Sequence, residues 1–157
     1  MAPFQGTLMM EEVSIRVATH KDLPAILQLY SQPDMNDGKI LSLSEAEEIL
    51  ERTKAYPDYQ VYVACRDSEI LGSFAMLIMD NLAQMGARSG IVEGLVVASQ
   101  WQGKGIGKQM IQFAMQKCRE AGCYKLVLSS NKKREKAHRF YQNLGFEQHG
   151  YSFVVKM

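Results

Sequence analysis

The sequence contains little cysteine, little proline and almost no net charge. It has three cysteines, four prolines and a formal charge of +1 in 157 residues. Cys65, Cys118 and Cys123 are odd in number and lack the spacing of metal ligands, so we expect reduced, buried thiols and no bound metal. The balanced charge gives no electrostatic basis for binding nucleic acid or an acidic membrane surface.

Long hydrophobic runs are also missing. No apolar stretch approaches the roughly 18 residues of a membrane span. Residues 1–12 lack the basic flank and apolar run of a secretory signal, so we interpret them as a tail or an expression remnant, with Met9 or Met10 as an alternative start. We expect a cytoplasmic protein in which residues 13–157 form a single domain.

Apolar residues alternate in some segments and recur every three or four positions in others, which predicts strands mixed with helices. Thr19 with Asp22, and Ser44 with Glu47, are spaced as capping boxes and predict two helix starts. The fold class predicted is α/β, a mixed sheet of six to seven strands with helices on both faces. The predicted strands are 13–17, 61–65, 70–79, 91–98, 124–129 and one or two within 146–156.

The most informative stretch is a strand followed by a glycine-rich turn and a helix. Residues 91–98 are apolar apart from Glu93, and the turn that follows contains Gly103, Gly105 and Gly107. A helix start has unpaired N–H groups and a partial positive charge, and glycines there let an anion approach the backbone. The turn therefore predicts a phosphate-binding site.

Two familiar phosphate motifs do not fit. In a dinucleotide fingerprint counted from Gly103, Lys108 stands where the third glycine is required, and the strand at 124–129 ends without a carboxylate. A P-loop requires Ser or Thr after Gly107-Lys108, and Gln109 stands there. A Q-x-x-G-x-G pattern remains, formed by Gln102, Gly105 and Gly107.

This pattern resembles the pyrophosphate signature of the GNAT superfamily of acetyl-CoA-dependent N-acetyltransferases. Downstream, residues 137–146 (AHRFYQNLGF) resemble the A-x-x-F-Y-x-x-x-G-F element of the same superfamily. The order and separation of the two motifs strengthen the match, which extends over nearly the whole chain from about residue 13. Residues 128–153 most resemble the aminoalkylphosphonate N-acetyltransferase branch, and more distantly the glucosamine-6-phosphate N-acetyltransferases.

The resemblance implies that the sheet opens between strands 91–98 and 124–129 to admit acetyl-CoA as cosubstrate. Main-chain groups of Leu95, Val96 and Val97 would pair with its pantetheine arm, and Asn131 would hold that arm or cap the next helix. Main-chain amides of the turn would hold the pyrophosphate. The turn residues are Gln102, Gly103, Lys104, Gly105, Ile106, Gly107 and Lys108.

Two side chains are candidates for catalysis. Glu93 is a carboxylate in an apolar strand, where burial should raise its pKa and suit it to act as the base that deprotonates the amine; the alternative is a structural glutamate. Strict alternation would place it on the same face as Leu95 and Val97. Tyr141 matches the family's general acid; its alternative role, aromatic packing, is better suited to Phe140.

The sequence defines the amine acceptor less well than the acetyl donor. A basic run at 132–139 is either a solvated helix face or a contact for the 3′-phosphate of the cofactor or for an anionic acceptor. The favoured function is acetylation of a small-molecule amine. The alternatives are acetylation of protein lysines or N-termini and a non-catalytic acyl-CoA-binding regulatory module. A homodimer is compatible with the family.

Overall fold

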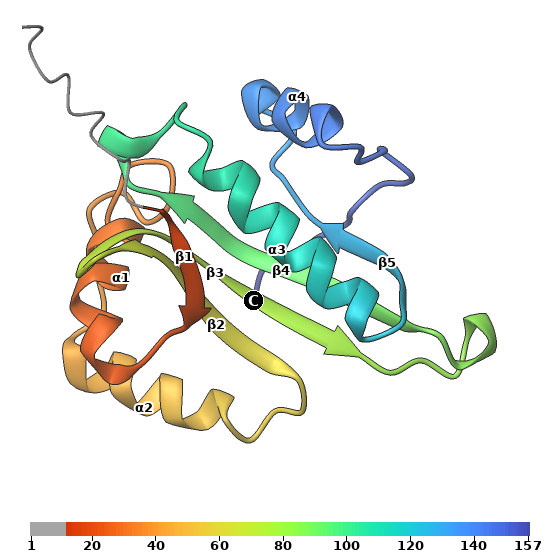
Figure 1. The fold of residues 1–157 in the computed structure, drawn as a ribbon, viewed down its shortest axis with the longest axis horizontal. Helices are drawn as coiled ribbons and strands as arrows, with labels where there is room; N and C mark the ends of the chain where they lie inside the picture. The colour runs from red at the N-terminus through yellow and green to blue at the C-terminus, as the bar shows by residue number, and fades with distance from the viewer. Residues whose placement is uncertain (1–11) are drawn as a thin grey trace, which may run out of the picture.

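The computed structural model describes residues 12–157, so the predicted tail lies almost entirely outside the described residues. A five-stranded sheet, in the order β1-β2-β3-β4-β5, has helices on both faces (Figure 1). The strands and helices are β1 (Ser14–Val17), α1 (Leu23–Tyr30), α2 (Leu43–Thr53), β2 (Tyr59–Arg66), β3 (Glu69–Met79), β4 (Arg88–Val97), α3 (Ile106–Glu120), β5 (Cys123–Leu128) and α4 (Glu135–Asn143). The predicted α/β class with a mixed sheet is confirmed.

The first four strands are antiparallel, and β5 joins β4 in parallel. The α3 helix makes the crossover between β4 and β5, because parallel neighbours cannot be joined by a tight turn. The β2–β3 hairpin turns at Asp67, as the sequence predicted, with a φ of 52° that Asp tolerates well.

The main core lies between the sheet and α3. Leu71 and Phe74 of β3 and Met110 and Ile111 of α3 are fully buried there. Gly90 lets the helix approach closely, since a Cβ at this position would lie 2.2 Å from the Cys118 sulfur. Smaller clusters pack α1 and α2 against the other face, and Val63 and Leu50 are among their buried residues.

Helix starts differ in part from the sequence prediction. The Thr19–Asp22 capping box is present and opens a short 3₁₀ turn that leads into α1. The second box is not Ser44 with Glu47: Ser42 caps α2, and its main-chain N–H donates to Glu45 at 2.9 Å. Ser42 with Glu45 has the same spacing as the predicted pair and overlaps it in the sequence. The structure uses Ser42, the earlier serine.

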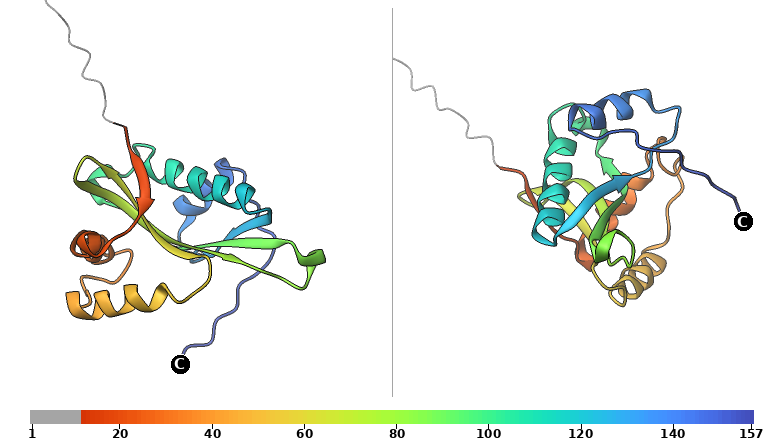
Figure 2. Two further views of the ribbon diagram at one scale, coloured as in Figure 1. Left: turned by 60° about the horizontal axis from the view of Figure 1, so that its bottom comes forward. Right: turned by 90° about the vertical axis from the view of Figure 1, so that its right-hand side faces the viewer.

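The sheet has fewer strands than predicted. Residues 146–157 contain no strand, so the count is five where six to seven were expected. Figure 2 shows the end of this segment, near the C-terminus, extending away from the body of the molecule. Alternating apolar and polar residues favour an extended backbone, but they form a strand only where a second backbone is available for pairing. The pattern alone does not show whether such a partner exists.

Candidate active site

The glycine turn connects the end of β4 to the start of α3. Gly103 and Gly105 have φ angles of 72° and 85°, and nothing lies within 4 Å of a Cβ built at either one. Gly105 is the N-cap of α3 and has no side chain to bond the first N–H groups of the helix. The turn therefore offers open backbone donors at the positive end of a 15-residue helix, which suits a diphosphate.

Strands β4 and β5 are paired over only part of their length. Their last registered pair is Val92 with Leu128. Beyond it, the rest of β4 pairs with β3 on one side and with no strand on the other side among residues 12–157. This is the opening in the sheet that the resemblance implied, and it leaves one side of Leu95 and Val96 without a strand partner.

A β-bulge interrupts β4 where the two strands separate. Ser73 of β3 pairs with Val96, and Ala75 pairs with Glu93, so Phe74 alone faces both Gly94 and Leu95. Gly94 has a φ of 61°, and its carbonyl accepts a hydrogen bond of 3.2 Å from the Tyr30 hydroxyl. The bulge reverses the alternation of side chains along the strand.

The reversal corrects the prediction for Glu93. Leu95 and Val97 pack against the α3 core, whereas Glu93 shares the α1 side of the sheet with Val96. The Glu93 side chain is exposed, so the predicted burial is wrong. Its charge is still felt nearby: burial, followed by the negative charge of Glu93, raises the pKa of Tyr59.

Tyr141 lies on α4 in an aromatic group. Its ring centroid is 5.2 Å from that of Phe140 and 5.7 Å from that of Phe146. Burial raises the pKa of the Tyr141 hydroxyl, and the positive charge of Arg134 opposes part of this rise. Phe140 also contacts the glycine-led helix, since a Cβ at Gly107 would lie 3.3 Å from its ring. This packing brings α4 and Tyr141 to the start of α3.

Asn131 is held in a local turn after β5. Its side-chain oxygen accepts a hydrogen bond of 2.9 Å from the Lys133 main chain, and its carbonyl is 2.9 Å from His138 Nε2. Asn131 therefore does not cap α4, whose N-cap is Arg134, and the capping alternative is wrong. The other alternative, a contact with the pantetheine arm, stays a prediction. The basic residues of the following run are exposed: Lys132, Lys133, Arg134, Lys136 and Arg139.

Gln32 contacts the end of β4, although no sequence pattern pointed to it. Its Nε2 donates to the Val97 carbonyl at 3.1 Å, and its Oε1 accepts from the Ser99 main chain at 2.7 Å. Gln102 donates to the same Val97 carbonyl at 3.2 Å. Two side-chain amides therefore hold the end of β4 where the glycine turn begins.

Trp101 lies directly before the glycine turn and contacts it through Lys104. The Arg66 guanidinium and the Lys104 ammonium each lie 4.9 Å from its ring centroid. Its Nε1 donates to Glu69 at 3.0 Å. Trp101 is the single tryptophan of the chain and directly precedes the glycine turn, so its position in the sequence could have suggested a contact with this turn.

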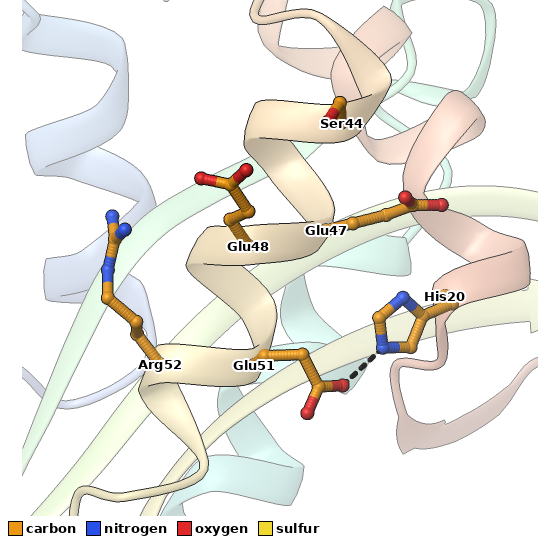
Figure 3. Close-up of a pocket in the computed structure, with 6 residues that line it drawn as sticks. All are labelled: His20, Ser44, Glu47, Glu48, Glu51 and Arg52. Atoms are coloured by element: carbon orange, nitrogen blue, oxygen red, sulfur yellow. Dashed lines mark hydrogen bonds and ion pairs between the residues drawn. The ribbon is translucent and has the colours of Figure 1, made fainter.

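A separate hollow lies along α2, on the other helical layer. Figure 3 shows Ser44, Glu47, Glu48, Glu51 and Arg52 along this helix, with His20 facing Glu51. His20 and Lys54 both pair with Glu51 at the surface. The hollow is open and solvated, and it does not include the glycine turn or Tyr141.

Comparison with known proteins identifies the class. The model of the acetyltransferase (GNAT) family matches residues 21–146, and the chain belongs to this family. It is an acetyl-CoA-dependent N-acetyltransferase. Within residues 12–157, no helix combines the length and apolar character that crossing a bilayer requires.

Individual relatives agree with the family. A glucosamine 6-phosphate N-acetyltransferase from Trypanosoma brucei brucei is 30% identical over 88% of this chain and 91% of its own. An aminoalkylphosphonate N-acetyltransferase from Salmonella typhimurium is 32% identical over 62% of this chain and 63% of its own. Among solved structures, a putative acetyltransferase from Agrobacterium tumefaciens has a TM-score of 0.85 at 27% identity, covering 92% of this chain and 99% of its own.

Proposed function

We propose that this protein transfers the acetyl group of acetyl-CoA to the primary amine of a small molecule by direct attack. One observation carries the proposal: β4 runs from the open end of the β4–β5 pairing into the uncapped glycine start of α3, and α4 brings the Tyr141 phenol there because its neighbour Phe140 contacts Gly107. The first two suit a donor with a diphosphate and an extended arm, and the third is a proton donor.

The residues fit the donor without side-chain obstruction. Main-chain amides from Gln102 to Lys108 would hold the pyrophosphate, because the two positive-φ glycines leave open space beside the backbone. Main-chain groups of Leu95, Val96 and Val97, with the side chain of Asn131, would hold the pantetheine arm. When bound, acetyl-CoA supplies the acetyl group as an activated thioester.

Glu93 is the proposed base. An amine with a pKa of about 10.4 is neutral only about 0.04% of the time at pH 7, which corresponds to about 4.6 kcal/mol. A carboxylate that removes this proton therefore accelerates the reaction. Because Glu93 is exposed, we propose that it accepts the proton through a water molecule.

Tyr141 is the proposed acid. A leaving thiolate requires a proton, and a phenol with a raised pKa keeps its proton at neutral pH until one is needed. Phe140 supplies the packing contact with α3, so the tyrosine hydroxyl is left for chemistry.

The proposed class of amine acceptor follows from the basic residues near Tyr141. The Arg134 charge acts on the Tyr141 hydroxyl, and an exposed basic run follows Asn131. The names of two relatives describe acceptors that carry both an amine and a phosphate or phosphonate. We therefore propose a small amine with an anionic group.

Release of free thiol from acetyl-CoA across an amine panel tests this function. The panel contains aminoalkylphosphonates, amino sugar phosphates and polyamines, with lysine peptides as a comparison. The proposal expects turnover with a phosphate- or phosphonate-bearing amine and mass spectrometry showing a gain of one acetyl group on it. Turnover confined to the peptides would instead identify a protein acetyltransferase.

A further inference from the structure

The side-chain amide of Gln32 bonds the end of β4 in the way that a neighbouring strand would. Its Nε2 donates to the Val97 carbonyl at 3.1 Å, and its Oε1 accepts from the Ser99 main chain at 2.7 Å. A residue of a parallel strand opposite Ala98 would bond the same two groups, because the slanted bonds of a parallel pair reach the residues before and after the one opposite. Within the described part of the chain, β5 no longer pairs with β4 at this point.

The main chain of Val97 faces away from β3. The Ala98 N–H donates to the Leu71 carbonyl at 2.8 Å, and Val97 is in register with Gly72 of β3. Hydrogen-bonded and non-hydrogen-bonded pairs alternate in an antiparallel ladder, so the N–H and the carbonyl of Val97 both point to the open side of the strand. Val97 is the last residue of β4, and its backbone therefore faces the opening in the sheet.

The carbonyl of Val97 is already occupied. Gln32 and Gln102 each donate to it from Nε2, at 3.1 and 3.2 Å. A carbonyl oxygen has two lone pairs, so these two bonds fill its capacity as an acceptor. The N–H is therefore the main-chain group of Val97 that can bond an incoming ligand.

A second residue from the end of α1 contacts β4 at the bulge. Tyr30, the last residue of this helix, donates from its hydroxyl to the Gly94 carbonyl at 3.2 Å. The contacts of Tyr30 and Gln32 enclose residues 95 and 96 between them along β4. The end of α1 thus holds the open stretch of β4 at both of its ends.

We propose that Gln32 is a positioning residue for the acetyl donor: it occupies the Val97 carbonyl and holds Ser99, so that the Val97 N–H is presented to the pantetheine arm of acetyl-CoA. This role rests on the proposed function, in which the arm enters the opening beside β4. The arm contains amide carbonyls, which accept a bond from such an N–H. Gln32 acts through the main chain of Val97 and needs no contact with the arm itself.

Two substitutions separate this role from simple packing. Gln32→Glu keeps the size of the side chain but turns a negatively charged acceptor towards the Val97 carbonyl, whereas Gln32→Ala removes the side chain and leaves Gln102 as a donor. We expect the Kd for coenzyme A to increase about 10-fold in Gln32→Glu and about 3-fold in Gln32→Ala. A residue that only packs would give the opposite order, because alanine loses more contacts than glutamate does.

Calorimetric titration with two ligands measures the effect. Coenzyme A carries both the diphosphate and the arm, and 3′-phosphoadenosine 5′-diphosphate carries the diphosphate without the arm. Both Gln32 variants should bind the second ligand as the wild type does, because the glycine turn is unchanged. An equal loss for the two ligands would show a general distortion of the site and would overturn the proposal. If Gln32→Glu does not fold, the comparison of the two ligands in Gln32→Ala decides.

Gln28→Glu is the matched control. Gln28 lies one turn earlier on α1 and is exposed, so the same change of charge is made on the same helix away from β4. Its affinity for both ligands should equal that of the wild type. Wild-type affinity for coenzyme A in both Gln32 variants, or a larger loss with alanine than with glutamate, would overturn the role of Gln32. A wild-type protein that binds neither ligand would instead overturn the proposed function, and this role with it.

Discussion

At the scale of single residues, the two proposed catalytic groups lie in different environments. Glu93 is exposed on the α1 side of the sheet, while Tyr141 is half-buried among aromatic rings. An exposed carboxylate has direct contact with water, and burial raises the pKa of the Tyr141 hydroxyl. The difference suits a base and an acid that act in the same reaction.

Replacing Glu93 with Gln should remove the base while keeping the size of the side chain. We expect kcat/KM to fall by about 10- to 100-fold and its increase with alkaline pH to flatten. The pH profile of kcat/KM measures this. An unchanged profile would exclude Glu93 from the mechanism.

Replacing Tyr141 with Phe should lower kcat by about 100-fold and leave the affinity for acetyl-CoA nearly unchanged. The substitution keeps the aromatic contacts with Phe140 and Phe146 and removes only the hydroxyl. Steady-state kinetics, with calorimetric titration of coenzyme A, check both parts. Turnover at the wild-type rate would reject the acid role.

An ion pair between a half-exposed arginine and a buried aspartate should make the free energy of unfolding depend on pH. Arg16 contacts both carboxylate oxygens of Asp22, and this contact lowers the pKa of Asp22 to about 2. A lowered folded-state pKa stabilises the protein above the unfolded value near 3.8 and loses that stabilisation as pH falls towards 2. Because Arg16 is half-exposed, we expect about 1–2 kcal/mol.

The variant Arg16→Gln isolates this effect. Urea unfolding between pH 7 and pH 2 should show the wild type losing its extra stability over the window from about 4 to 2, with the variant already lacking it. Parallel curves for the two proteins over that window would show that the pair does not act in this way.

At the scale of elements, the bulge in β4 puts Glu93, the proposed base, on the opposite face of the sheet from Leu95 and Val97. Gly94 has positive φ, and a Cβ there would lie 2.9 Å from the Tyr30 hydroxyl. Gly94→Ala should therefore cost about 1–3 kcal/mol and reduce activity, because both the conformation and the Tyr30 contact are disturbed.

Gly38→Ala is the control for Gly94→Ala. Gly38 also has positive φ, 81°, but nothing lies within 4 Å of its Cβ. It should show the conformational cost alone, about 1 kcal/mol, with activity retained. Equal losses of stability and activity in the two variants would contradict the role given to the bulge. Thermal unfolding and initial rates provide the comparison.

The sequence predicted most elements but not this bulge. Val13, Ile15 and Val17 alternate as β1 does, and the glycine turn led into α3 as expected. A glycine inside a strand often marks a β-bulge, and Gly94 lies inside the predicted strand 91–98. The position of Glu93 was therefore predictable in principle, although strict alternation gave the wrong face.

Other features could not be read from the sequence, because they depend on contacts distant along the chain. Gln32 and Val97 are 65 positions apart, and the hydrogen bond between them leaves no local pattern. The missing strand at 146–157 is similar, since its residues favour extended backbone but the partner is not encoded beside them.

At the scale of the whole molecule, the open sheet predicts a strong response to the cosubstrate. Saturation at about 100 times Kd adds about 2.7 kcal/mol to stability. For a chain of this size, that corresponds to a rise of about 5–10 °C in Tm. Thermal unfolding with and without coenzyme A measures the rise, with pantetheine as a ligand that lacks the diphosphate.

Two glycine variants test whether the rise in Tm comes from diphosphate binding at the start of α3. Gly105→Glu places a carboxylate at the start of α3 and should abolish the rise in Tm. Gly122→Glu is the control beyond the other end of the helix, where φ is also positive and space is open. A rise that persists in Gly105→Glu would mean that the diphosphate lies elsewhere.

The bulge has a further consequence for how such an enzyme diversifies. Ahead of Gly94, the Glu93 side chain lies on the α1 side of the sheet, and after Gly94 the Leu95 side chain packs against the α3 core. Under the proposed roles, Glu93 serves the amine and the main chain from Leu95 to Val97 serves the donor. With these proposed roles, substitutions around Glu93 would change the choice of amine and leave the recognition of coenzyme A unchanged. A single extra residue in β4 would then separate the surroundings of the amine from those of the donor.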